Sequence, residues 1–175
     1  MLKFKKKTET LKVICPWDPS IDTKKSDMKS YLETLDINHL KFEVGKDPSI
    51  IHITSMSRWV MAKLVRLNVN DLNTFNLAAF RHGIEKIENM QDHLLTDEVE
   101  IDGGTGVWIP EDVAEGPNGA LIPCFSEEDA IQFFNTEFRN FVASVVAARS
   151  NLRKGKLNPY AQPLSLYLRT YASKE

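Results

Sequence analysis

The sequence is poor in cysteine and contains no long apolar run. Its 175 residues include two cysteines, Cys15 and Cys124, 109 positions apart, and two thiols cannot form a disulfide framework or a four-thiolate zinc site. We interpret both as small buried hydrophobic side chains or free thiols. Apolar runs such as Val142–Ala148 are far shorter than the ~20 residues that cross a bilayer, so we expect no membrane-spanning helix and no membrane partner. The basic start, residues 1–7, lacks the apolar stretch of a secretory signal. We therefore expect the protein in a cytoplasm or in a particle assembled there.

Several short patterns invite a chemical interpretation, but each lacks a part that the chemistry needs. The glycine cluster Gly103–Gly106 has neither the lysine of a P-loop nor the spacing of the dinucleotide fingerprint, which favours a hairpin turn. His52 begins a His-x-Thr pattern that certain phosphoesterases use in two copies, and this chain has one. His52 is better interpreted as a strand residue that points away from its neighbours Ile51 and Ile53.

Metal-ligand spacing is also missing. The other histidines, His39, His82 and His93, show no His-x-x-x-His spacing. The acidic stretch from Asp97 to Asp102 lacks the ordered oxygen positions of a calcium loop, so a solvated hairpin edge is favoured. We therefore predict no catalytic residue, no cofactor and no metal site.

The net charge of -2 is unevenly distributed. Residues 1–7 carry +4 and residues 149–175 carry +5, which leaves -11 on residues 8–148. An acidic body with two basic ends suggests that the ends lie on an acidic surface, either that of the same body or that of a neighbouring copy. A nucleic acid backbone is the alternative partner, and solvated ends that only aid solubility are the simplest interpretation.

Length and composition, with 42% hydrophobic and 26% charged residues, fit one globular domain. We predict an α+β fold in which three main helices pack with two short antiparallel strand pairs. Residues 1–8 are expected to form a basic N-terminal arm, residues 9–152 the single domain, and residues 153–175 an extended C-terminal arm, because the pattern after Arg149 loses helical periodicity.

The predicted strands follow turn residues and alternation. A strand over Thr10–Cys15 ends at Pro16, and His39–Val44 with Ser49–Thr54 has the pattern of a hairpin. Glu98–Ile109 around the glycine cluster predicts a second hairpin. Residues 110–123 are expected to form an exposed loop.

Three segments predict helices. Ser57–Leu67 and Asp71–Met90 place apolar residues at helical spacing, and Gly83 lies on the apolar face of the second, where it would permit a close contact or a bend. The third begins at a capping box at Ser126 and continues along an apolar stripe to Val145. Its phenylalanines are expected in the core rather than around a cofactor.

The order of these elements resembles small morphogenesis proteins encoded among the structural genes of tailed bacteriophages. The resemblance lies in Glu9–Asp22, in the strand pair Phe42–Thr54, in Ala79–Asn89 and in the last helix, Phe138–Leu152. The chain departs from that group in the insertion 92–123 and in the arm after Leu152. The resemblance implies a non-enzymatic virion structural or assembly protein of a head-tail, tail or capsid-associated part, assembled in the host cytoplasm and located in the virion.

In this hypothesis the partners are other copies of the chain or other virion proteins. The acidic region from Glu98 to Pro123 would present a contact edge, and the C-terminal arm would dock on another subunit. Removing residues 153–175 would then leave a folded monomer that no longer assembles. The apolar and aromatic anchors of the arm would be Leu164, Leu166, Tyr167, Leu168 and Tyr171.

The alternative is a nucleic-acid-binding accessory protein. Its tyrosines, such as Tyr160, would stack on bases while Arg153, Lys154 and Lys156 contact phosphates. The acidic body argues against it, because it would repel a backbone that ran past the arms. An enzyme assembled from scattered residues is a third interpretation that no pattern favours.

Overall fold

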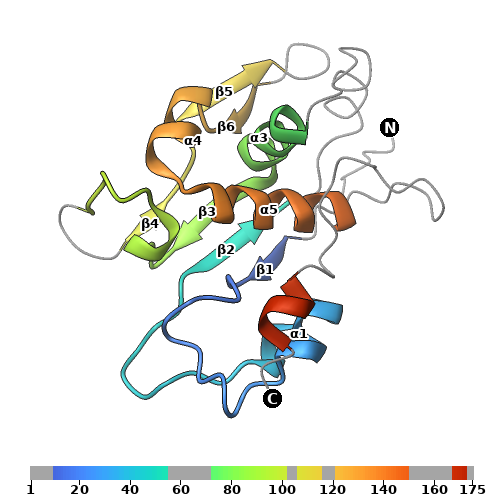
Figure 1. Cartoon of the computed structure of the whole chain (residues 1–175). Helices are drawn as coiled ribbons and strands as arrows, with labels where there is room; N and C mark the ends of the chain where they lie inside the picture. The colour runs from blue at the N-terminus through green and yellow to red at the C-terminus, as the bar shows by residue number, and fades with distance from the viewer. Residues whose placement is uncertain (1–9, 55–71, 102–105, 116–120, 150–166, 173–175) are drawn as a thin grey trace, which may run out of the picture.

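The structure is a computed structural model that describes residues 10–54, 72–101, 106–115, 121–149 and 167–172 (Figure 1). The chain forms an α+β fold, as the sequence predicts. The helices and helical turns are α1 (Met28–Thr34), η1 (Ile37–His39), α3 (Leu72–Gly83), η2 (Asp92–Leu94), α4 (Glu127–Phe133), α5 (Thr136–Arg149) and η4 (Leu168–Ala172). The strands are β1 (Leu11–Val13), β2 (Ile50–Ile53), β3 (Ile84–Glu88), β4 (Val107–Trp108), β5 (Asp112–Glu115) and β6 (Leu121–Cys124).

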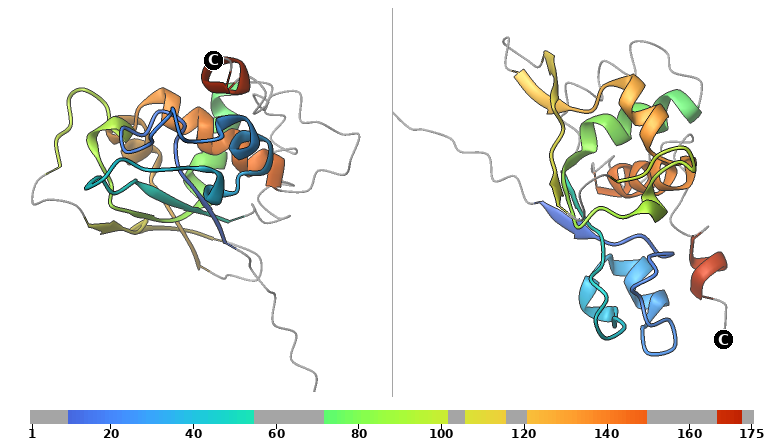
Figure 2. Two further views of the ribbon diagram at one scale, coloured as in Figure 1. Left: turned by 90° about the horizontal axis from the view of Figure 1, so that it is seen from below. Right: turned by 90° about the vertical axis from the view of Figure 1, so that its left-hand side faces the viewer.

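The strands form two antiparallel sheets. The larger has the order β1-β2-β3-β4, and β5 pairs with β6 in a separate two-stranded sheet. Helices α3 and α5 lie on one face of the larger sheet (Figure 2), where Val13, Ile51 and Ile87 are fully buried beneath them. Strand alternation places His52 and Lys86 on the opposite face, as expected for His52. The β5–β6 sheet and α4 lie at one end of the molecule, and α1 and η4 lie side by side at the other (Figure 1).

An aromatic cluster joins the helices to the sheet. The ring of Phe80 on α3 lies 5.1–5.6 Å from the rings of Phe125, Phe134 and Phe138. Trp108 on β4 lies 4.8 Å from Phe125 and from Phe134. The phenylalanines of this cluster are fully or almost fully buried, so they are core residues as the helical stripe predicts.

Gly83 ends α3 where that helix crosses α5. A Cβ atom at this position would overlap the Cγ2 atom of Val146 and lie 3.4 Å from its Cγ1 atom. The close contact expected from the sequence is confirmed. The backbones of the two helices approach as closely as they do because Gly83 has no side chain.

Replacing Gly83 with alanine is therefore expected to lower the free energy of unfolding by about 1–3 kcal/mol, since Val146 is buried and stiff at χ1. Val146→Ala removes the overlapping methyl groups. The double variant Gly83→Ala/Val146→Ala should then be at least 1 kcal/mol or so more stable than the sum of the two single effects predicts. Chemical denaturation of the four proteins measures this coupling, and strict additivity would contradict the contact.

The predicted helix Asp71–Met90 is wrong beyond Gly83, where the chain continues as β3. Ile53 pairs with Ile84, whereas the preceding residue His52 pairs with Lys86, so Glu85 is an extra residue in a β-bulge. The bulge returns Ile84 and Ile87 to the same buried face. Three-residue apolar spacing is typical of a helix, and here a bulged strand produces it.

The third predicted helix is two helices. Phe134 is extended and forms a bridge with Leu95, which separates α4 from α5. The Asn135 side chain accepts a hydrogen bond from the Phe138 N–H at 2.8 Å and donates to the His93 and Leu95 carbonyls at 2.9 and 3.1 Å. Asn135 thus starts α5 and ties it to the loop after η2. The Ser126 cap is confirmed, because its hydroxyl accepts from the Asp129 N–H at 3.0 Å.

Both predicted hairpins are wrong in their pairing. β2 pairs with β1 and β3, while residues 39–44 contribute only the isolated bridge between Phe42 and Ile21. Of the second hairpin, β4 pairs with β3, and residues 98–101 lie in no strand. The expected loop 110–123 instead contains β5 and β6. The predicted strand at Thr10–Cys15 is present as β1, and the predicted helix Ser57–Leu67 lies outside the described residues.

Candidate functional site

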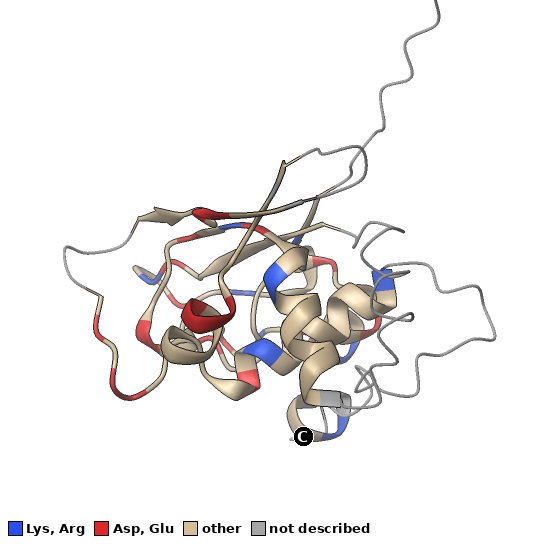
Figure 3. Ribbon diagram, turned by 90° about the horizontal axis from the view of Figure 1, so that it is seen from above, with Lys and Arg blue, Asp and Glu red and all other residues tan. Residues whose placement is uncertain are grey.

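One part of the fold is built from a strongly acidic stretch of the chain. Residues 87–138 contain thirteen aspartates and glutamates and no lysine or arginine. This acidic segment contains η2, β4, β5, β6 and α4, and Figure 3 marks acidic residues along α4 and on the loop that follows η2. With no basic side chain of its own, the segment creates a negative surface that attracts basic partners.

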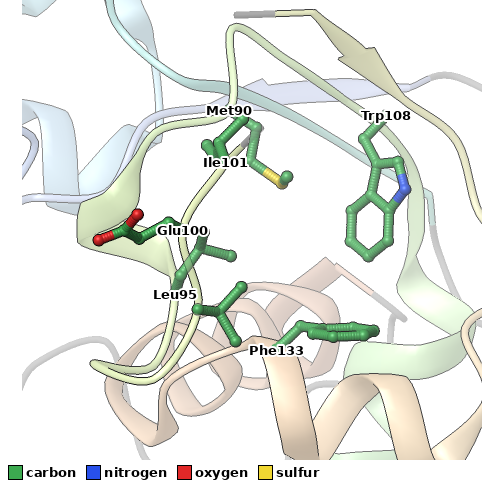
Figure 4. Close-up of a pocket in the computed structure, with 7 residues that line it drawn as sticks. Met90, Leu95, Glu100, Ile101, Trp108 and Phe133 are labelled. Carbon is green, nitrogen blue, oxygen red and sulfur yellow. The ribbon is translucent and has the colours of Figure 1, made fainter. Parts of the chain in front are cut away.

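An apolar surface pocket of about 260 Å³ lies within the acidic segment. The carboxylate of Glu100 points away from the hollow (Figure 4), so the side chains that face it are apolar. The lining residues come from the end of β3, the loop after η2, β4 and α4: Met90, Leu95, Val99, Glu100, Ile101, Trp108 and Phe133. The sequence interpretation missed this pocket because its walls are brought together by pairing between separate segments, the β3–β4 ladder and the bridge between Leu95 and Phe134.

The acidic segment also exposes large apolar side chains. Strand alternation turns Trp108 toward the core and its neighbours Val107 and Ile109 outward. In the β5–β6 sheet, the exposed Val113 pairs with Pro123. We call the four strand-associated residues with 50–68% of their surface exposed the apolar edge: Val107, Ile109, Val113 and Leu121. Exposed large apolar side chains bordered by charge are typical of protein-interaction surfaces.

The predicted arm is not extended where the structure describes it. Tyr167 is 8% exposed, and its ring lies 5.3 Å from that of Phe141 and 6.4 Å from that of Trp17. The ring of Tyr171 lies 6.2 Å from that of Trp17, and its hydroxyl donates to Glu137 Oε1 at 2.8 Å. The arm prediction is therefore wrong for residues 167–172, which form η4 against the chain's own body. Because Trp17 and Phe141 belong to the same chain, their effective concentration at the tyrosines is high, which favours this contact over one with another copy.

Of the remaining predicted contact residues, Leu168 belongs to η4. The other expected anchors and the expected nucleic-acid contacts lie outside the described residues: Leu164, Leu166, Arg153, Lys154, Lys156 and Tyr160.

A buried polar cluster contains residue types that catalytic sites use, but its hydrogen bonds hold parts of the chain together. The carboxylate of Asp18 accepts hydrogen bonds from the Ser20 N–H and hydroxyl at 2.9 and 2.6 Å and from the Ser49 N–H at 2.9 Å. His93 Nε2 lies 3.2 Å from its Oδ2. Burial disfavours the charge, but the hydrogen bonds from His93, Ser20 and Ser49 hold the pKa of Asp18 below its ordinary value. The Asp18 carboxylate thus joins the loop after β1, the residue before β2 and η2.

The cysteines show no sign of activation. Burial and the nearby carboxylates of Asp18 and Glu137 raise the pKa of the Cys15 thiol well above its ordinary value. A protonated buried thiol is a poor nucleophile. Within the described ranges, no three histidine, cysteine, aspartate or glutamate side chains are gathered as metal ligands, and no helix there is long and apolar enough to span a membrane.

Fold and surface together define an α+β protein whose acidic segment combines an apolar pocket with an exposed apolar edge. No protein-family model matches the chain, and no curated protein and no solved structure is significantly similar to it.

Proposed function

We propose that the protein is a non-enzymatic structural or assembly component of a phage virion that acts through protein-protein contacts of its acidic segment. The observation that carries the proposal is the apolar edge, four half-exposed or more exposed apolar side chains inside a segment without any basic residue. The virion assignment rests on the resemblance of the sequence to tailed-phage morphogenesis proteins.

The charges of the chain favour other copies of itself as the partner. The acidic segment is complementary to residues 1–7 and 149–175, which carry +4 and +5. Copies of the chain can therefore attract one another, acidic segment to basic end. The apolar edge adds burial that persists at salt concentrations that screen the charges.

A double variant of the β5–β6 sheet tests this role. Val113→Ser/Leu121→Ser removes two exposed apolar side chains and should weaken self-association tenfold or more, because interface anchors each contribute roughly 1 kcal/mol or more. Val44→Ser is the matched control, since Val44 is fully exposed but lies outside the acidic segment. Sedimentation velocity over a concentration series measures the change. Equal association of the double variant and the wild type would contradict a role for the apolar edge.

Nucleic acid binding is the competing hypothesis. An oligonucleotide bound through the basic ends would be released steeply as salt is raised, with a slope set by the number of phosphates contacted. The Val113→Ser/Leu121→Ser variant would bind it as tightly as the wild type. If the oligonucleotide binds in this way and the protein stays monomeric, nucleic acid binding replaces assembly as the proposed function.

A further inference from the structure

We infer that the apolar pocket of the acidic segment receives the basic N-terminal segment of a second copy, residues 1–7, with Phe4 as the anchor in the pocket. The inference deepens the proposed assembly function and rests on it. The N-terminal segment lies outside the described residues, so its part in the argument comes from its sequence, Met-Leu-Lys-Phe-Lys-Lys-Lys.

The pocket has the size and lining for an aromatic ring. Its volume of about 260 Å³ is below the usual range of small-molecule sites, roughly 300–1,000 Å³. Apolar cavities of about 150 Å³ already bind benzene. Trp108 and Phe133 border the hollow with Met90 opposite them (Figure 4), so a phenyl ring would gain ring-ring and sulfur-ring contacts.

The charge around the pocket matches the residues around Phe4. Asp97 and Glu98 are exposed and lie between the lining residues Leu95 and Val99 in the sequence, and the exposed Glu100 points its carboxylate away from the hollow. In the N-terminal segment, Phe4 has a lysine on each side and two more lysines follow. A ring in the hollow would therefore bring several ammonium groups to several carboxylates, which sets the register of the segment.

The connection of β1 favours a second copy as the donor. Leu11 aligns through Ile53 with Ile84, and Met90 at the pocket lies six residues beyond Ile84 and two strands across from β1. At about 3.3 Å per residue and 4.8 Å per strand, the separation is about 22 Å. The seven residues from Phe4 to Leu11 span at most about 25 Å when fully extended. β1 also runs toward the pocket end of the sheet, so the segment of the same copy would have to reverse direction, and the small excess of length is too short for that turn.

Photo-crosslinking between two isotopic forms of the full-length protein tests the donor and the site together. One form carries p-benzoylphenylalanine in place of Phe4, and the other is wild type and labelled with ¹⁵N. The inference predicts crosslinks from position 4 to peptides that contain residues 90–101, 108 or 133 of the labelled copy. Crosslinks confined to the unlabelled copy, or to other surfaces, would overturn it.

Variants separate this inference from the proposed function. Phe4→Ser should weaken association tenfold or more, whereas Phe4→Leu, which stays apolar, should retain most of it. Lys5→Glu/Lys6→Glu should weaken it as well, and Glu98→Lys/Glu100→Lys on the partner copy should restore binding. If the tail variants associate like the wild type while Val113→Ser/Leu121→Ser does not, the apolar edge mediates assembly and the pocket does not receive Phe4. If wild type does not associate at all, both proposals fail.

Discussion

Replacing Asp18 with alanine is expected to lower the free energy of unfolding by about 3–5 kcal/mol. The change leaves the N–H groups of Ser20 and Ser49 without their acceptor, and both residues are at most 1% exposed. Buried donors without a partner lose their full hydration. Asp47→Ala is the control, since Asp47 is exposed and the next loop depends on its backbone carbonyl. Urea denaturation of both variants measures the difference, and similar losses would contradict the account.

The same carboxylate gives stability a pH dependence. The pKa of Asp18 is lowered in the folded state, so its contribution is present above the unfolded pKa, about 3.9, and is lost as the pH falls through the folded pKa. Asp18→Asn removes this titration. Its unfolding free energy should be lower than that of wild type at neutral pH and should fall less steeply below about pH 4. Parallel pH profiles would contradict the lowered pKa.

Tyr167→Ala is expected to cost about 3 kcal/mol of stability, a value typical of a buried aromatic residue replaced by alanine. Tyr167 packs between Trp17 and Phe141, and burial raises the pKa of its phenol above the ordinary value. Removing residues 153–175, which the sequence predicts to leave a folded monomer, is therefore expected to cost stability as well, because Tyr167 is buried against the body of the chain. Tyr171→Phe keeps its ring against Trp17 and loses only the exposed hydrogen bond to Glu137, so it should cost less than about 1 kcal/mol.

Thermal and chemical unfolding of these two tyrosine variants also addresses assembly. If Tyr167 anchored another copy, Tyr167→Ala would reduce association and leave the stability of the monomer unchanged. The packing in the structure predicts the opposite order of effects, a less stable monomer at dilutions where no association occurs.

The features that the sequence predicted correctly are mainly those that a few neighbouring residues determine. The strand before Pro16 and the Ser126 cap each depend on a few neighbouring residues. The alternation around His52 likewise follows from the geometry of a single strand. These predictions required no knowledge of distant parts of the chain.

Features that depend on distant partners were not predictable. The bulge at Glu85 imitates helical spacing, and Phe134 leaves the helical stripe because Leu95 provides a bridge. β6 contains Pro123, which favours a loop in sequence but is tolerated in a strand of a two-stranded sheet. The pocket joins four separate segments, and only the absence of lysine and arginine from residues 87–138 marks its surroundings in the sequence.

The most direct test of the central claim is the mass of the full-length protein in solution across a concentration series, at low and moderate salt, with and without an unrelated oligonucleotide. The account predicts a concentration-dependent oligomer whose mass does not change when the oligonucleotide is added, and which weakens but persists as salt screens its charges. A protein that stays monomeric at every concentration, or that binds the oligonucleotide and releases it with salt, would contradict it.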